Sequence, residues 1–368
     1  MKFLKRFFGG EEESEQSKAF GNTRRPENSQ STGPAEPDLG EAGRGKGPAR
    51  EKEIEIEWDP EQGCLEVETK QDLELGLSKF MFELSEGEVH VVGTDKVQQP
   101  ELTITERIYA DSEPEAINYQ KDSFVGVSAD WDSLLVIGKN SLGVVSGGSG
   151  NVPTVGGSSQ SAPRRETQVV LKVPVAKNLD EGKAPEPERA YFITVDSGHI
   201  GVENGTGRYT ISAGSGNVVI KGCRMMAGSK IETGSGGIKV TGTTFNSCRI
   251  ETGSGGIEVT GTTFNLCTIE TGSGNVGVTG ILDSFIIITG SGNVGVTGIF
   301  TGKNTVKTGA GNILVKFGRG QGEIEVQTSS GGGAIQTTKS FFKGVKNPNG
   351  QTARLSLITQ AGKIEVNE

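Results

Sequence analysis

Few residues in this chain could carry out chemistry, and three glutamates stand out because they recur at a constant spacing. Glu232, Glu251 and Glu270 are 19 residues apart, and each lies between Ile and Thr-Gly-Ser-Gly. Like charges about 5 Å apart repel in water, so three stacked carboxylates could bind a cation or a basic partner. Acidic residues on one exposed face also act in polysaccharide-cleaving enzymes. We favour a simpler interpretation, a solvated edge neutralised by Lys230 and Arg249.

The histidines and cysteines form no recognisable catalytic or metal-binding motif. His90 and His199 lie far apart beside Val or Ile, as surface histidines do, and no Ser/His/Asp set suggests itself. The four cysteines lack the C-x-x-C spacing of a metal site. Cys248 and Cys267 are either two small buried residues, which we favour, or a disulfide between neighbouring coils. We therefore predict no catalytic, cofactor-binding or metal-binding residue, no cofactor and no enzymatic activity.

The strings that contain these residues repeat along the C-terminal half. The segments 231–242, 250–261 and 269–280 share Ile-Glu-Thr-Gly-Ser-Gly, a three-residue alternating stretch that ends in Val, and Thr-Gly. A fixed period of about 20–50 residues is the signature of stacked repeats. The first glycine of each Gly-x-Gly gives a period close to 19, at positions 214, 234, 253, 272, 290 and 309.

Each repeat contains short strands separated by glycine turns. In residues 256–260 apolar and polar residues alternate, as in a strand with one buried face. One coil is too small to bury its own apolar face, but stacked parallel coils about 4.8 Å apart can do so. Stacking predicts two internal ladders: Ile238, Ile257, Val276, Val294 and Ile313, and Val240, Val259, Val278, Val296 and Val315. It also predicts a hydrogen-bonded corner ladder of Asn217, Asn275, Asn293 and Asn312.

We therefore predict an all-β fold, a parallel β-solenoid with coils of about 19 residues. Residues 1–50 are predicted as a short amphipathic tip and a disordered arm, because the arm has too few large apolar residues to order itself. Residues 51–142 alternate apolar and polar, and we predict a β-rich N-terminal part of the solenoid domain. Residues 143–166 are predicted as a flexible Gly/Ser loop. Residues 167–368 would form the solenoid repeats with a C-terminal cap, whose charged last coil faces water.

Composition argues against several classes of protein. The 57 glycines follow no strict triplet, so the chain is not collagen-like. The net charge of −9, with no extended basic stretch in the repeats, argues against a nucleic-acid partner. No run of about 18 apolar residues occurs, and the N-terminus lacks the apolar core of an ordinary secretory signal. We therefore expect a cytoplasmic protein.

The first eight residues have the pattern of a short interfacial membrane anchor. Basic residues occupy one side of the helix that they would form, and apolar residues share the other side: Phe3, Leu4, Phe7 and Phe8. Eight residues span about 12 Å as a helix, too little to cross a bilayer. One interpretation is peripheral contact with the inner face of the cell membrane. The alternative is a partly ordered terminus, or one that docks on a partner.

Three features together resemble a family of bacterial adhesin-like β-solenoid domains of uncharacterised function. They are the segment 85–91, the strand 169–174, and the train of Thr-Gly-Ser-Gly-x-Ile/Val-x-Val coils that follows. The resemblance covers roughly residues 84–368. It implies a β-solenoid and a binding role towards an unknown protein or envelope component.

These observations favour a non-enzymatic adhesin-like binding or scaffold protein built on a rigid β-solenoid, with the N-terminus as a candidate membrane tether. Two alternatives stay open. One is a bactofilin-like cytoskeletal scaffold that self-associates by stacking solenoid ends, against which the charged last coil argues. The other is a polysaccharide-active β-helix enzyme.

Overall fold

The computed structural model describes residues 52–74, 76–122, 124–129, 132–139, 163–175, 188–336, 340–347 and 350–367. These residues form 27 strands and one helix, so the predicted all-β fold is confirmed. The predicted tip and arm, and residues 143–162 of the predicted loop, lie outside the described residues. No helix in the described part of the chain is long and apolar enough to cross a membrane.

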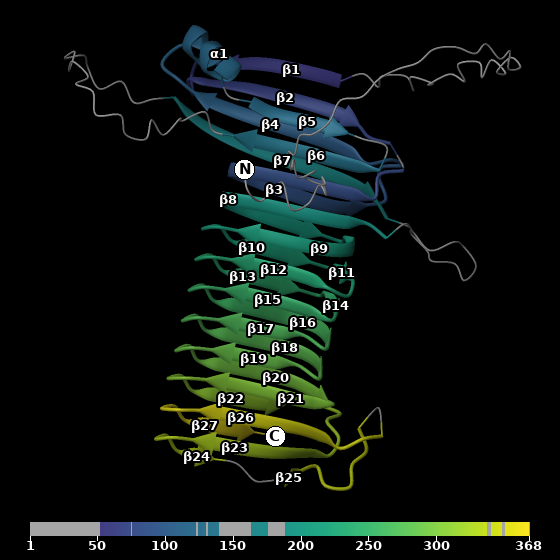
Figure 1. The fold of residues 1–368 in the computed structure, drawn as a ribbon, viewed down its shortest axis with the longest axis vertical. Coiled ribbons are helices and arrows are strands. Elements are labelled where there is room, and N and C mark those ends of the chain that lie inside the picture. Colours follow the sequence, from purple (N-terminus) through teal and green to yellow (C-terminus); the bar gives the residue numbers. More distant parts are fainter. Residues whose placement is uncertain are drawn as a thin grey trace, which may run out of the picture. The chain divides into compact units, whose positions relative to one another are not determined.

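The C-terminal half of the chain winds into coils, and each coil pairs in parallel with its neighbours (Figure 1). The first wall contains β8 (Ala190–Glu203, N-terminal half), β9 (Thr206–Ala213), β12 (Ser229–Thr233), β15 (Cys248–Thr252), β17 (Thr268–Thr271), β19 (Ile286–Thr289) and β21 (Lys303–Thr308). The second wall contains the C-terminal half of β8, then β10 (Val218–Lys221), β13 (Ile238–Thr241), β16 (Ile257–Asn265), β18 (Val276–Asp283), β20 (Val294–Thr301) and β22 (Ile313–Phe317). A short third side contains β11 (Arg224–Met225), β14 (Thr244–Asn246) and the ends of β16, β18 and β20.

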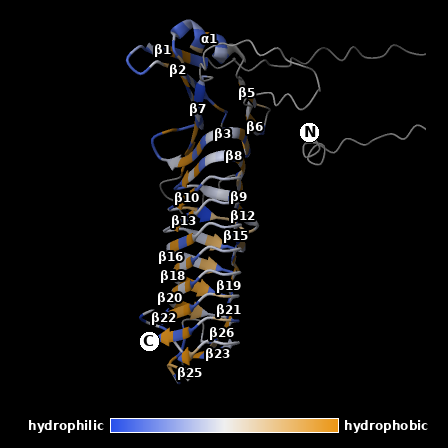
Figure 2. Ribbon diagram, turned by 90° about the vertical axis from the view of Figure 1, so that its left-hand side faces the viewer, coloured by the Kyte–Doolittle hydropathy of each residue, from blue (hydrophilic) through white to orange (hydrophobic). Residues whose placement is uncertain are grey.

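The two predicted apolar ladders are confirmed residue by residue. Ile238 pairs in register with Ile257, and Val240 with Val259, and the same steps continue through β18, β20 and β22. All members are at most 2% exposed. On the third side the rings of Phe245 and Phe264 stack with centroids 5.4 Å apart. Figure 2 shows apolar residues recurring coil after coil. Because burying one such side chain contributes about 1.5–3 kcal/mol, the coils stabilise one another.

The Thr-Gly-Ser-Gly string, or a close variant of it such as Thr308-Gly-Ala-Gly, makes one corner of most coils. The Thr252 hydroxyl donates to the carbonyl of Gly236 in the preceding coil (2.9 Å) and accepts from the N–H of Gly255 (3.1 Å). Glycine is required here because a Cβ on Gly255 would lie 1.8 Å from the Gly236 oxygen. The same threonine bridge recurs at Thr233, Thr271, Thr289, Thr308 and Thr359.

The asparagine ladder forms at the same corner, directly after the Gly-x-Gly, but has a gap. The backbone N–H of Asn293 donates to the side-chain oxygen of Asn275 (2.8 Å), and Asn312 donates to Asn293 in the same way (2.9 Å). Asn217 accepts from the N–H of Gly237 (2.8 Å). Because glycine occupies positions 237 and 256, Asn217 is separated from the other three asparagines, so the predicted ladder exists in two parts.

The N-terminal part extends the same walls and ends one of them with antiparallel strands. Strand β3 (Lys79–Thr94) pairs in parallel with β8 along most of its length, and its C-terminal half also pairs in parallel with β7 (Arg164–Pro174). Antiparallel pairing then continues from β7 to β4 (Glu101–Tyr109), β2 (Cys64–Asp72) and β1 (Lys52–Asp59). The hairpin of β5 (Phe124–Ala129) and β6 (Ser133–Lys139) pairs with the N-terminal half of β3. Helix α1 (Glu113–Asp122) packs on β2 and β4.

Two boundaries differ from the sequence-based expectation. Strand β7 begins at Arg164, so the last three residues assigned to the loop 143–166 are strand. The last coil of the sequence is also not the last of the stack. Strand β26 (Ala353–Thr359) lies between β21 and β23 (Ile324–Ser330), and β27 (Ile364–Asn367) lies between β22 and β24 (Ile335–Gln336).

The prediction that the charged last coil faces water at the end of the stack is therefore wrong. The coil of β26 and β27 has four fully inward apolar side chains at Leu355, Leu357, Ile364 and Val366, so it gains most from neighbours on both edges. The end position falls to β23 and β24, where Ile335 stays 43% exposed. Strand β25 (Ser340–Phe341) covers the first two residues of β23.

Candidate functional site

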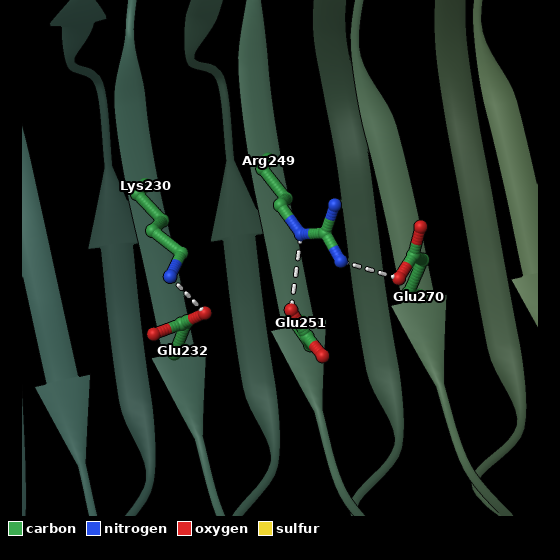
Figure 3. Close-up of polar contacts among 5 residues, drawn as sticks. All are labelled: Lys230, Glu232, Arg249, Glu251 and Glu270. Atoms are coloured by element: carbon green, nitrogen blue, oxygen red, sulfur yellow. Dashed lines mark hydrogen bonds and ion pairs between the residues drawn. The ribbon is translucent and has the colours of Figure 1, made fainter.

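The stacked glutamates lie in register on the outer face of the first wall (Figure 3). The Nε of Arg249 lies 3.0 Å from the carboxylate of Glu251, and its Nη2 lies 2.7 Å from that of Glu270 in the next coil. Lys230 makes the equivalent ion pair with Glu232. The hydrogen bond to Glu251 raises the pKa of the Arg249 guanidinium. The structure thus agrees with the favoured interpretation, an edge whose carboxylates are neutralised.

The same pairing between coils occurs elsewhere on the outer face. Lys239 Nζ lies 3.0 Å from Glu258 in the next coil, and Lys221 Nζ lies 2.8 Å from Glu203 in the preceding coil. Exposed pairs of this kind contribute about 0–1 kcal/mol each, so they remove free charge more than they add stability. This arrangement leaves carboxylates beside cations, which is poor for general acid or base catalysis.

The structure brings the two histidines closer than their sequence positions indicate. His90 on β3 has its Nε2 3.2 Å from a carboxylate oxygen of Glu88, and Glu88 pairs in register with His199 on β8. His199 accepts a hydrogen bond at Nδ1 from the N–H of Asn217 (3.2 Å), so it starts the corner ladder. Among the residues that the structure describes, no three His, Cys, Asp or Glu side chains are arranged to hold a metal ion.

Cys248 and Cys267 meet inside the stack as free thiols, with their sulfur atoms 2.7 Å apart. Burial raises the pKa of Cys248, and the hydrogen bond from Cys248 lowers the pKa of Cys267. Both side chains are at most 6% exposed, as the favoured interpretation of small buried residues requires.

A shallow open groove of about 680 Å³ lies on the N-terminal strands, at the turn between β1 and β2. Two of its lining residues, Arg107 and Tyr109, belong to a polar network: Arg107 Nε lies 2.6 Å from Glu66, and the Tyr109 hydroxyl donates to Glu166 (3.2 Å). The guanidinium of Arg164 lies 5.9 Å above the Tyr109 ring. Burial raises the pKa of Tyr109. The lining includes Glu57, Asp59, Glu61, Cys64 and Glu66.

The groove contains more carboxylates than cations, so it favours a cationic group over an anion. The sequence did not predict it, because its walls come from strands that are more than 40 residues apart and pair antiparallel. The alternating glutamates of residues 53–59 were the only signal in the sequence.

Exposed aliphatic side chains also occur on the outer faces of the coils. Ile281 on β18 is 47% exposed and pairs in register with Ile299 of the next coil. Ile286 and Ile288 are about two-fifths exposed on β19, and Leu266 is exposed at a corner. These positions add apolar contact area to surfaces that are otherwise polar and neutralised.

Comparison with known proteins identifies the domain. The family model described as Toastrack DUF4097 matches residues 139–367, more than half of the chain. Among solved structures, a "putative cell adhesion protein" from Clostridium sporogenes is 13% identical, with 82% of this chain and 98% of that chain covered and a TM-score of 0.19.

A "putative adhesin" from Bacteroides fragilis is 9% identical, with 82% and 96% covered and a TM-score of 0.36. A "putative lipid binding protein" from Parabacteroides distasonis is also 9% identical, with 81% and 96% covered and a TM-score of 0.29. No curated protein matches the chain. The family match confirms the resemblance to bacterial adhesin-like β-solenoid domains, and the chain belongs to the Toastrack DUF4097 family.

Proposed function

We propose that this protein is a non-enzymatic, adhesin-like binding or scaffold protein whose working part is the stacked solenoid. The observation that carries this proposal is the use of outward charges to bridge neighbouring coils, as in the pairs of Arg249 with Glu251 and Glu270. Such a surface presents a fixed pattern of neutralised charge and exposed aliphatic side chains. It offers contact area for a partner rather than a reactive group.

Rigidity supports the same role. Hydrogen bonds at the threonine corner and apolar ladders repeat in most coils, and aromatic rings stack between some of them, so a partner would meet a surface that is already ordered. A preorganised surface loses less conformational entropy on binding, which improves affinity.

The polysaccharide-enzyme alternative is open to a direct test. We expect no hydrolysis or lysis when the full chain is incubated with a panel of acidic and neutral glycans. Cleavage that is abolished by Glu251→Gln but retained in Glu258→Gln would overturn the proposal, because it would give the ladder a catalytic role.

The second part of the proposal is a membrane tether at the inner face of the cell membrane, formed by Phe3, Leu4, Phe7 and Phe8. The basic residues beside these side chains favour an anionic lipid surface. The test is sedimentation of the full chain with vesicles of neutral and anionic phospholipid. We expect Phe7→Asp to weaken vesicle binding about tenfold or more, because burial of one Phe contributes about 1.5–3 kcal/mol.

The matched control is Phe20→Asp, which makes the same change outside the amphipathic tip. Equal binding by the two variants and the unchanged chain would remove the tether from the proposal. Filaments of the full chain in electron micrographs would instead favour the bactofilin-like alternative, in which solenoid ends stack.

A further inference from the structure

Strand β1 is an outermost strand of the sheet and has a free edge. It runs for eight residues and, among the described strands, pairs only with β2 (Figure 1). An unpaired edge presents backbone N–H and C=O groups that a further strand can bind. Adding a strand to such an edge is an established mode of peptide recognition, in which backbone hydrogen bonds give affinity and alternate side chains give specificity.

One face of β1 is acidic, and its glutamates make no close ion pair among the described residues. Glu53, Glu55 and Glu57 are exposed and make no ion pair with any described residue. Lys70 on β2 pairs in register with Glu53, but its ammonium group forms its ion pair with Glu68 and interacts with Glu53 and Glu55 only at longer range. Strand β1 therefore differs from the solenoid coils, where a glutamate such as Glu258 forms a close ion pair with a cation of the neighbouring strand.

The other face of β1 is apolar and uncovered. Ile54 is 53% exposed and Ile56 is 63% exposed, although they pair in register with β2. Helix α1 packs on β2 and β4, and its apolar cluster includes Trp58 at the end of β1 but neither isoleucine. A long exposed edge with aliphatic side chains would be prone to aggregation without the charges on its opposite face.

We propose that the free edge of β1 binds an extended segment of a partner protein in which basic and apolar side chains alternate. The basic side chains would face Glu53, Glu55 and Glu57, and the apolar side chains would cover Ile54 and Ile56. A second copy of β1 is a poor occupant, because pairing it with itself would place glutamates on the same face close together. The acidic groove beside the turn at residues 60–63 would extend the acidic face that binds the partner's basic side chains.

The probe is a fluorescent seven-residue peptide of alternating Lys and Val, N-methylated at alternate amides so that only one edge can pair. Fluorescence anisotropy measures its binding to the full chain, and hydrogen exchange locates it. We expect saturable binding of the probe and slower amide exchange in residues 52–59 of the protein. The matching peptide of alternating Glu and Val should bind at least tenfold more weakly.

Two variants make the test specific. Because a charge pair across neighbouring strands changes affinity about twofold to fivefold, Glu55→Lys should weaken the Lys peptide about threefold to tenfold and strengthen the Glu peptide. Glu258→Lys makes the same charge change on a distant coil and should leave both affinities unchanged. Both positions are exposed, so neither variant should impair folding.

Three results would overturn the proposal. One is an equal effect of the two variants, and another is unaltered exchange at residues 52–59. The third is protection of residues 52–59 that is already present without the probe peptide and disappears when residues 1–10 are deleted, because the occupant would then be the chain's own basic terminus. Vesicle binding does not depend on β1, so failure here leaves the membrane test unaffected.

Discussion

Gly255 and Gly256 are adjacent glycines at the corner that leads into β16, and substitution by alanine should have opposite effects at the two positions. A Cβ on Gly255 would lie 1.8 Å from the carbonyl oxygen and 2.5 Å from the carbonyl carbon of Gly236, in the preceding coil. Real Cβ atoms essentially never come within 3.0 Å of such neighbours. A Cβ on Gly256 would lie 3.5 Å from its nearest neighbour, which is ordinary contact.

The cost of Gly255→Ala can be estimated from what must move. The atoms in the way belong to the backbone, so the two coils would have to separate at this corner. Separation strains the hydrogen bond from Thr252 to Gly236 (2.9 Å) and the backbone bond from Ile238 to Gly256 (3.0 Å). Overpacking costs about 1–3 kcal/mol and each of the two lost hydrogen bonds about 0.5–1.5 kcal/mol, which gives a total of about 2–6 kcal/mol.

Gly256→Ala should instead stabilise by about 0.4–1 kcal/mol, because alanine reduces the freedom of the unfolded chain without a clash. Neither glycine has a φ in the left-handed region, so backbone strain does not confuse the comparison. Urea unfolding followed by far-ultraviolet circular dichroism measures both free energies. If the free energies of unfolding of the two variants differed by less than about 1 kcal/mol, the close packing of Gly255 against the carbonyl of Gly236 would be refuted.

Three further predictions use the corners and the core. Thr252→Val should lower the free energy of unfolding by about 1–3 kcal/mol, because a carbonyl and an N–H lose their shared partner, whereas Thr252→Ser should cost little. Gly256→Asn should raise it by about 0.5–1.5 kcal/mol by offering the N–H of Asn275 a side-chain oxygen that fills the ladder gap. Burial raises the pKa of Cys223 from 9.0 to about 11, so this thiol ionises at a lower pH in the unfolded chain than in the folded chain. The free energy of unfolding should then fall from pH 9 to pH 11 by up to about 1.4 kcal/mol per pH unit, and this slope should shrink in Cys223→Ala.

The interior of the solenoid was predictable from sequence because its period is fixed. Once Ile238 and Ile257 occupy equivalent positions in two repeats, parallel stacking leaves only one register that keeps both inside. The alternation of Glu258 and Val259 then decides which side chain faces water. Ladders, corners and neutralised charges all follow from this one rule.

The order of the last coils was not predictable in this way. Residues 324–336 and 353–367 both have the alternation of a solenoid coil, and each could stack on β21 and β22. Which of the two coils lies at the end of the stack depends on which one leaves the less apolar edge exposed. That comparison involves tertiary contacts, which the period of the sequence does not reveal. The groove escaped prediction for a related reason, since Glu66 and Arg107 meet only through antiparallel pairing of distant strands.

The central claim is that stacked coils share a dry interior that no single coil possesses, and Val259→Asp tests it most directly. Val259 is 1% exposed between Val240 and Val278, so a carboxylate there would be buried without a partner. The control is Thr260→Asp, one residue further along β16 and facing solvent. In urea unfolding we expect Val259→Asp to lose about 4 kcal/mol or more and Thr260→Asp to lose less than about 0.5 kcal/mol. Equal tolerance of the two variants would contradict the claim.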